Sequence, residues 1–249
     1  MQTVIPKTSA ALAALLRADL KTQWRNRRSV VLLLLVPVII LILWKGLIEK
    51  MGGAFALSTC ITIGLTAIGL MGYSNAIARD RDKGVFQRLR VTPVPTWSIM
   101  VSRLVVQLLM ILLVTTFVFL VGSEYDKVNL TPTGYALSYL TALVGGAMYL
   151  GLGQMIVGLV KNAETVNSTT RLVYFLFIMV GMFGDLGVLG KELQKIIRWS
   201  PYGTVKNILA SSMQPSNWDN TSTLALLATL GYAILFSYLG IKNFKWNTN

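Results

Sequence analysis

The densest group of ionisable side chains in this sequence lies at residues 79–103, between two long apolar runs. It holds six basic and two acidic residues, namely Arg79, Asp80, Arg81, Asp82, Lys83, Arg88, Arg90 and Arg103. Placing one arginine or lysine at the centre of a bilayer costs at least roughly 2.5 kcal/mol, so the segment is expected in water. Charges that alternate in this way select a partner protein and set its register, which makes the segment a candidate docking surface.

Residues 80–89 of this segment are predicted to form a short helix, with Gly84 loosening its middle and two prolines after its end. Phe86 and Leu89 are three residues apart and therefore share one helix face. Because buried apolar anchors carry most of the energy of an interface, we expect this pair to fill a pocket in a partner. The alternative is that the loop only supplies the positive charge that fixes membrane orientation.

Two stripes of residues at spacings of three and four are candidates for a substrate path. They are Thr59, Thr62, Thr66 and Tyr73, with Gly69, in the second apolar run, and Phe175, Met179 and Met182 in the fifth. Small and hydroxylated residues allow close helix packing, so the first stripe either packs helices together or borders a path. Methionine and aromatic surface suits varied hydrophobic ligands, but it is also ordinary packing material. Spacing alone leaves both alternatives open.

Several kinds of chemistry are excluded by what the chain lacks. It has no histidine, the commonest general base and metal ligand, and neither a GxxxxGK[ST] nor an HExxH motif. Cys60 is the only cysteine, so no intramolecular disulfide forms. The acidic residues fall at the ends of apolar runs or between them, which argues against a proton relay. We therefore expect no catalytic residue, no metal site, no cofactor and no enzyme activity in this chain.

The composition is that of a membrane protein, because 54% of the 249 residues are hydrophobic and only 13% are charged. Six apolar runs are each close to the roughly 20 residues that cross a bilayer. They cover residues 29–48, 54–78, 99–122, 134–160, 169–190 and 221–241. The predicted fold is an all-α polytopic protein with one six-span domain, residues 29–241. Pro37 is expected to kink the first span.

Two further segments are predicted to be helical without spanning the membrane. Residues 7–28 place leucines and a tryptophan on one side of a helical wheel and bases on the other, which predicts an amphipathic surface helix within the cytoplasmic segment 1–28; the alternative is a loose basic leader. Residues 185–220 are too polar to span and too apolar for a free loop. Two short helices broken at Ser200 and Pro201, re-entrant or in the outer interface, are expected there, and the alternative is a surface loop.

Orientation follows from the distribution of the basic residues. With the amino terminus inside, the inner segments 1–28, 79–103, 161–171 and 242–249 hold 16 of the 23 lysines and arginines. The positive-inside rule then places both termini, including the tail 242–249, in the cytoplasm of a multi-pass protein of the inner or plasma membrane. The net charge of +13 is explained by this topology, so the expected partner is the lipid membrane and not a nucleic acid.

These segments together resemble the membrane subunits of ATP-binding cassette exporters, the ABC type 2 permease family. The likeness is carried by RNRRSVVLLLLVPVIIL, by DRDKGVFQRLRVTPVPTWSIMVSRLV and by LQKIIRWSPYGTVKNILA. The resemblance implies that residues 79–98 are the coupling loop and that residues 80–89 dock in a separate ATPase, which binds ATP and magnesium. It also implies a pair of these chains with two ATPases. The family often has glutamate where Asp80 and Asp82 stand, and threonine where Val85 stands.

Two functions from different classes follow. The first is the membrane subunit of an ATP-driven exporter, with a hydrophobic drug-like molecule, a lipid or a glycan as substrate. The second is a membrane anchor or scaffold that recruits a cytoplasmic protein without transport. The sequence favours the first, because a scaffold has no need of a re-entrant outer pair of helices.

Overall fold

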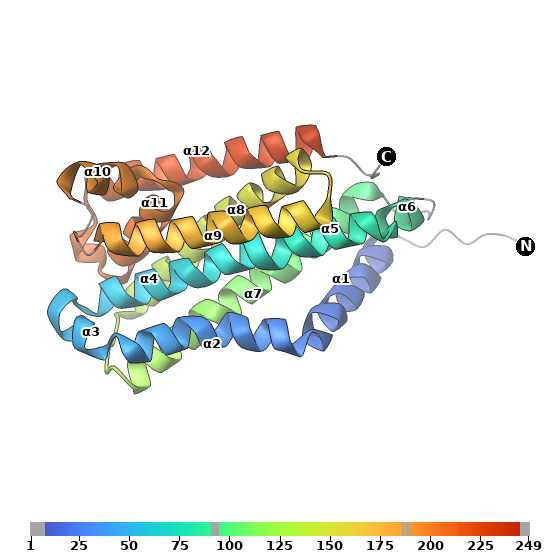
Figure 1. The fold of residues 1–249 in the computed structure, drawn as a ribbon. Coiled ribbons are helices and arrows are strands. Elements are labelled where there is room, and N and C mark those ends of the chain that lie inside the picture. The colour runs from blue at the N-terminus through green and yellow to red at the C-terminus, as the bar shows by residue number, and fades with distance from the viewer. Residues whose placement is uncertain (1–7, 91–94, 186, 188–189, 245–249) are drawn as a thin grey trace, which may run out of the picture.

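The structure, a computed structural model, describes residues 8–90, 95–185, 187 and 190–244, and every element in these ranges is a helix. The predicted tail beyond residue 244, the first seven residues and part of the 79–98 loop lie outside the described residues. The helices run side by side in one bundle, and the start of α1 and the end of α12 lie at the same end of it (Figure 1). In chain order they are α1 Thr8–Arg25, α2 Arg27–Leu43, α3 Lys45–Met51, α4 Gly53–Thr66, the π-helix η1 Ala67–Ser74, α5 Asn75–Asp82, α6 Val85–Arg90, α7 Thr96–Glu124, α8 Pro132–Leu159, α9 Ala163–Asp185, α10 Lys191–Trp199, α11 Pro201–Met213, the 3-10 helix η2 Pro215–Asn217 and α12 Asn220–Asn243.

The helical polytopic fold predicted from the sequence is confirmed. Within the described ranges, five helical runs are long and apolar enough to cross a membrane, or up to six if the bent pair α1 and α2 is counted as one span. The runs Gly53–Asp82, Trp97–Glu124, Pro132–Leu159, Ala163–Gly184 and Asn220–Asn243 correspond to the second to sixth predicted spans. The first predicted span, 29–48, ends earlier than expected, because the chain leaves helical geometry at Trp44 and α3 begins as a separate helix.

Helix α1 is attached to the third span. It packs against α7, and the hydroxyl of Ser102 donates a hydrogen bond of 2.6 Å to the carboxylate of Asp19. Leu20 and Trp24, on the apolar side of the predicted amphipathic helix, remain exposed. The helix predicted from the periodicity therefore forms, with its exposed apolar side chains available to a membrane surface; that it rests on one stays a prediction.

The centre of the bundle is the crossing of η1 over α8. A Cβ atom added at Gly153 would collide with the backbone oxygen of Gly69, and one added at Gly69 would lie 2.5 Å from the backbone oxygen of Tyr149. Backbone atoms cannot move aside as a flexible side chain can, so these two positions exclude any side chain. Small residues here let two membrane helices approach within backbone contact, which replaces lipid by protein packing.

The outer segment forms two helices broken where the sequence predicts the break. Pro201 begins α11, and the hydroxyl of Ser200 caps it by accepting a hydrogen bond of 3.2 Å from the amide of Gly203. Helix α11 inserts among α4, α8 and α12 and is largely buried, whereas Ile196 of α10 is 68% exposed. Figure 1 shows α10 at the end of the bundle opposite α6. The surface-loop alternative is therefore wrong.

A matched pair of glycines tests the central crossing. Gly153→Ala is expected to lower the free energy of unfolding by about 1–3 kcal/mol, because the added methyl group overpacks a contact between two backbones. Gly231→Ala is the control, since nothing lies within 4 Å of a Cβ atom added at Gly231 on α12. Thermal unfolding of the purified variants measures both. Equal midpoints would mean that the approach of η1 and α8 tolerates a side chain.

Candidate functional site

A cleft of about 780 Å³ lies between α2, the continuous run of α4, η1 and α5, and α9. Its volume is within the range of roughly 300–1,000 Å³ that is usual for small-molecule sites. One part of its wall is apolar and the other is polar. The apolar lining includes Leu33, Val36, Pro37, Ile63, Ala67 and Met71, and the polar lining is Asn26, Asn75, Arg79, Glu164, Asn167 and Arg171.

The polar and apolar linings follow one another along the span. Ile63 and Arg79 both line the cleft, and helical rise places them roughly 20 Å apart along the second span. Arg79 lies within one turn of the end of α5, at the end of the bundle that carries α6, and Pro37 lies in the apolar part, inside α2. The cleft therefore runs from a charged rim at that end toward the hydrocarbon depth of the membrane.

The π-helix decides which residues of the second span face the cleft. Its wider turns are stabilised locally, because the hydroxyl of Ser74 donates a hydrogen bond of 2.8 Å to the backbone oxygen of Gly69, five residues earlier. The wider turns rotate the rest of the helix, α5, about its axis. Asn75 and Arg79, which are four residues apart on α5 and share one face, both line the cleft. The guanidinium of Arg79 also donates to the backbone oxygen of Asn75 at 3.2 Å. Such π-helical segments occur frequently at functional sites.

The threonine stripe does not line the cleft. Thr59, Thr62 and Thr66 are buried, and each hydroxyl donates to the carbonyl four residues earlier, at 2.7–2.8 Å. The hydroxyl of Tyr73 donates to the side-chain oxygen of Gln154 on α8, at 2.8 Å. All four side chains point into the bundle. This arrangement agrees with the packing alternative for the threonines, whereas Tyr73 and Gln154 line a second, smaller pocket of about 260 Å³. That the stripe borders a substrate path stays a prediction.

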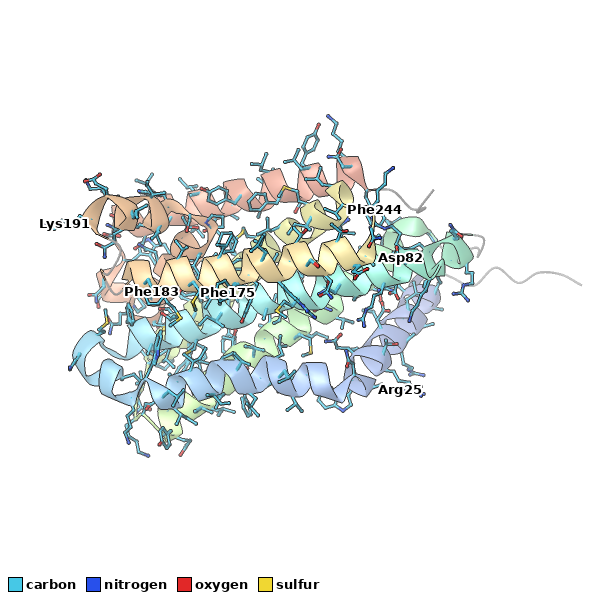
Figure 2. The ribbon with its side chains drawn as sticks, viewed as in Figure 1. Arg25, Asp82, Phe175, Phe183, Lys191 and Phe244 are labelled. Atoms are coloured by element: carbon cyan, nitrogen blue, oxygen red, sulfur yellow. The ribbon has the colours of Figure 1, made fainter. Side chains whose placement is uncertain are left out.

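The stripe on α9 also lies away from the cleft. Phe175 is 58% exposed on the outer surface of α9, where Figure 2 shows it with Phe183 along the same helix. Met179 and Met182 are half-buried, and neither is part of the cleft lining. The residues of α9 that do line it are Ala163, Glu164, Asn167, Arg171 and Tyr174. Sequence reasoning missed these because polar residues near the end of an apolar run are also common where a helix meets water.

The predicted helix 80–89 is divided in two. The second span continues to Asp82, the chain turns at Gly84, which has a φ of +65°, and α6 occupies only Val85–Arg90. Glycine adopts a φ in the left-handed region without steric strain, whereas a residue with a side chain is strained there. Gly84 thus ends one helix and starts another, where the sequence reading expected a loosened single helix.

Arg81 is a buried structural residue, with 2% of its surface exposed. Its guanidinium donates hydrogen bonds of 2.8 Å to the backbone oxygens of Val157 and Val160, and a third to that of Lys161. These carbonyls end α8, where the helix leaves its last acceptors unsatisfied and its dipole is negative. Arg81 therefore joins the end of the second span to the turn between α8 and α9. This corrects the expectation that Arg81 is exposed for docking.

Phe86 is also buried inside the chain, which corrects its expected place on the docking surface. Its ring meets Phe244 edge to face with centroids 6.0 Å apart, and the guanidinium of Arg103, which pairs with Asp80, lies 5.3 Å from the ring centroid. Figure 2 shows Phe244 and Asp82 at the same end of the bundle. Leu89 is half-buried. Burial of Phe86 holds α6 against the bundle, since an aromatic ring removes a large apolar area from water.

The exposed residues at the end of α5 and on α6, within residues 82–88, are polar. Asp82, Lys83, Gln87 and Arg88 are exposed, and the guanidinium of Arg88 donates to the backbone oxygen of Lys83 at 2.9 Å. The carboxylate of Asp82 accepts a hydrogen bond of 3.3 Å from the amide of Ala163, the first residue of α9. A folded, charged surface is thus presented at the end of the bundle where the cleft has its polar rim.

A bundle of membrane-spanning helices with such a cleft and loop is the architecture of a membrane-embedded transport subunit. Comparison with known proteins identifies the family: the chain belongs to the ABC-2 type transporter family, whose model matches residues 10–213. This assignment confirms the resemblance noted in the sequence. ABC-2 permeases are membrane subunits that pair with an ABC ATPase, so the chain is a transmembrane transporter subunit.

Individual relatives agree with the family. The chain is 24% identical over 232 residues to YvfS of Bacillus subtilis (strain 168), named as a transport permease, with 89% of this chain and 92% of the relative covered. It is 29% identical over 101 residues to YbhR of Escherichia coli (strain K12), named as a multidrug ABC transporter permease. That second match covers 40% of this chain and 27% of the relative.

Removal of the Arg81 side chain tests its structural role. Arg81→Ala is expected to destabilise the protein by about 3 kcal/mol, because one buried and two half-buried backbone oxygens lose a charged donor. Arg81→Lys should recover part of this loss, since an ammonium group keeps the charge and reaches fewer acceptors. Arg88→Ala is the control, and as an exposed arginine it is expected to change stability by about 0.5 kcal/mol or less. Denaturation midpoints of the purified variants decide; equal midpoints for Arg81→Ala and Arg88→Ala contradict the capping role.

Proposed function

We propose that this chain is the membrane subunit of an ATP-driven exporter and that the cleft between α2, α4–η1–α5 and α9 is where its substrate enters from the cytoplasmic side. The observation that carries the proposal is the cleft itself, with its volume of about 780 Å³, its apolar depth and its polar rim beside the charged loop. A scaffold that only recruits a cytoplasmic protein has no use for such a cleft, which favours the exporter over that alternative.

The energy source in this proposal is a separate ATPase, which binds ATP and magnesium. The sequence contains no phosphate-binding loop motif, and pairing with an ABC ATPase is implied by the family. The proposed docking face consists of the exposed Asp82, Lys83, Gln87 and Arg88. Phe86 supports this face from inside the bundle, so the partner would meet charged and amide groups where the sequence had suggested an apolar anchor.

The internal contacts of the loop suggest how docking would reach the cleft. The hydrogen bonds from Arg81 to the end of α8 and from the amide of Ala163 to Asp82 join α5 to the turn that begins α9. Two of the three cleft walls, α5 and α9, would therefore move together. Helix α2 has no such bond to either, among the side-chain hydrogen bonds of the described residues. Movement of the α5–α9 pair against α2 would open and close the cleft.

A second copy of the chain is the proposed cover for the surface around the cleft. The flanking faces of α2 and α9 expose Leu32, Leu35, Ile39, Leu172, Phe175 and Leu176. Membrane helices associate through packing and polar contacts, because lipid tails are as apolar as leucine. The proposed assembly is two chains with two ATPases.

The orientation proposed for this assembly, with both termini in the cytoplasm, is tested by labelling single cysteines. Gln87 on α6 and Glu124 at the end of α7 are exposed and belong to opposite ends of the bundle. In intact cells, a membrane-impermeant thiol reagent should modify Glu124→Cys and leave Gln87→Cys unmodified until the cells are opened. Native Cys60 is buried and serves as the silent background. Modification of Gln87→Cys from outside rejects the topology.

Docking is tested by making the same type of substitution, glutamine to tryptophan, at opposite ends of the bundle. Gln87→Trp adds bulk to the exposed face of α6 and is expected to reduce co-purification of an ABC ATPase expressed with the chain at least about tenfold, since a steric clash at the centre of an interface costs more than about 1.4 kcal/mol. Gln194→Trp makes the same change on exposed α10 and should leave binding unchanged. Transport and substrate-stimulated ATP hydrolysis should fall only for Gln87→Trp. Normal binding and hydrolysis by that variant would exclude this face.

A further inference from the structure

Two arginines face the cleft from different helices, Arg79 on α5 and Arg171 on α9. Both are exposed, and neither belongs to an ion pair within the described part of the chain, where the ion pairs are Arg103 with Asp80 and Lys195 with Glu192. Glu164 is the acid in the lining. The charged groups lining the cleft therefore sum to one positive charge.

Arg171 lies where the segment 161–171, which is cytoplasmic in the proposed topology, continues into the fifth span. It follows the first residue of α9 by eight positions, about 12 Å along the helix axis, inside the run Ala163–Gly184 that is apolar enough to span the membrane. An arginine within an apolar span is disfavoured by several kcal/mol unless it has a partner or a role, so such residues mark substrate and ion pathways. The chain itself offers Arg171 no carboxylate partner among the described residues.

The remaining lining matches one kind of molecule. Asn167 adds an amide group to the polar lining, and Asn75 adds a second, one hydrogen of which is donated to the backbone oxygen of Met71 at 2.9 Å. Beyond them the wall becomes the apolar surface of Pro37 and Ile63. A charged head followed by a hydrocarbon tail satisfies both parts at once. A free anion would leave the apolar part empty, a neutral chain would leave the arginines without a counter-charge, and a cation would be repelled by them.

We propose that the cleft selects an amphiphile with a single anionic headgroup, a phosphate or a carboxylate, taken from the cytoplasmic leaflet of the membrane. Arg79 and Arg171 hold the headgroup, since guanidinium groups match carboxylate and phosphate oxygens with paired hydrogen bonds. The tail lies along α2 and α4. This inference rests on the proposed function and names the substrate class of the same cleft.

Binding is measured on the purified full-length chain in zwitterionic lipid nanodiscs, without ATPase or nucleotide. The probes are fluorescent dodecyl phosphate, the matching neutral dodecanol and the matching dodecyltrimethylammonium cation. The phosphate probe should bind at least about tenfold more tightly than the other two, because charge-assisted hydrogen bonds form only with an anion. Millimolar inorganic phosphate should not displace it, since the free ion has no tail for the apolar wall.

Variants assign the preference to the cleft. Arg171→Gln should weaken binding of dodecyl phosphate about tenfold and leave dodecanol unchanged, whereas Arg171→Lys should keep most of the affinity. Arg198→Gln, the same change at an exposed arginine of α10 at the other end of the bundle, is the control and should bind as the wild type does. Glu164→Gln should strengthen binding of the phosphate probe, because it removes the opposing charge from the rim.

The outcomes separate this inference from the proposed function. The inference that the cleft selects an anionic amphiphile is wrong if the three probes bind equally or if the cation binds more tightly. It is also wrong if inorganic phosphate displaces dodecyl phosphate. If Arg171→Gln does not fold, as judged by gel filtration, Arg79→Gln and Glu164→Gln decide in its place. If the wild type docks its ATPase and transports other molecules but shows no preference for the anion, this inference is wrong and the proposed function stands. If the chain binds the anion but docks no ATPase, the proposed function is wrong and the anion selectivity of the cleft stands.

Discussion

The hydrogen bonds from Arg81 to the last carbonyls of α8 are the interaction on which the functional end of the molecule depends. They satisfy helix-end acceptors that would otherwise be buried without donors, and they do so with a charge placed at the negative end of a helix dipole. Through them the second span, the α8–α9 turn and the loop form one unit. The charged surface of the loop and the α5 and α9 walls of the cleft are thereby linked by hydrogen bonds, and buried Phe86 packs α6 against the bundle.

A second constraint acts at the centre of the bundle. Glycine at 69 and at 153 lets η1 and α8 meet backbone to backbone, so the second span is packed too tightly on that side to move alone. Its other side faces the cleft, and the π-helical turns bring Asn75 and Arg79 round to it. The second span thus has a packed side, which carries the buried threonines and the glycine contact with α8, and another side that lines the cleft.

Much of the architecture was predictable from residue types, and the candidate site much less so. The apolar runs and the break at Ser200 and Pro201 follow from local rules on length and proline. Thr59, Thr62 and Thr66 were correctly placed on one face, but which neighbour that face meets is a tertiary property, and it meets the interior. Phe86 was expected to fill a pocket in a partner, because an apolar residue in a charged loop is a typical interface anchor. It packs instead against Phe244, which is distant in sequence.

By itself the sequence determined that this is a helical membrane protein, because hydrophobic length and charge distribution set which segments leave water. It also located the loop that separates the second and third spans. Only the tertiary structure decided that Arg81 is internal, and that Asn75, Arg79, Asn167 and Arg171 share one cleft. The reason is physical: periodicity defines the faces of a single helix, whereas a site is built where faces from α2, α5 and α9 meet, and that depends on how the helices pack.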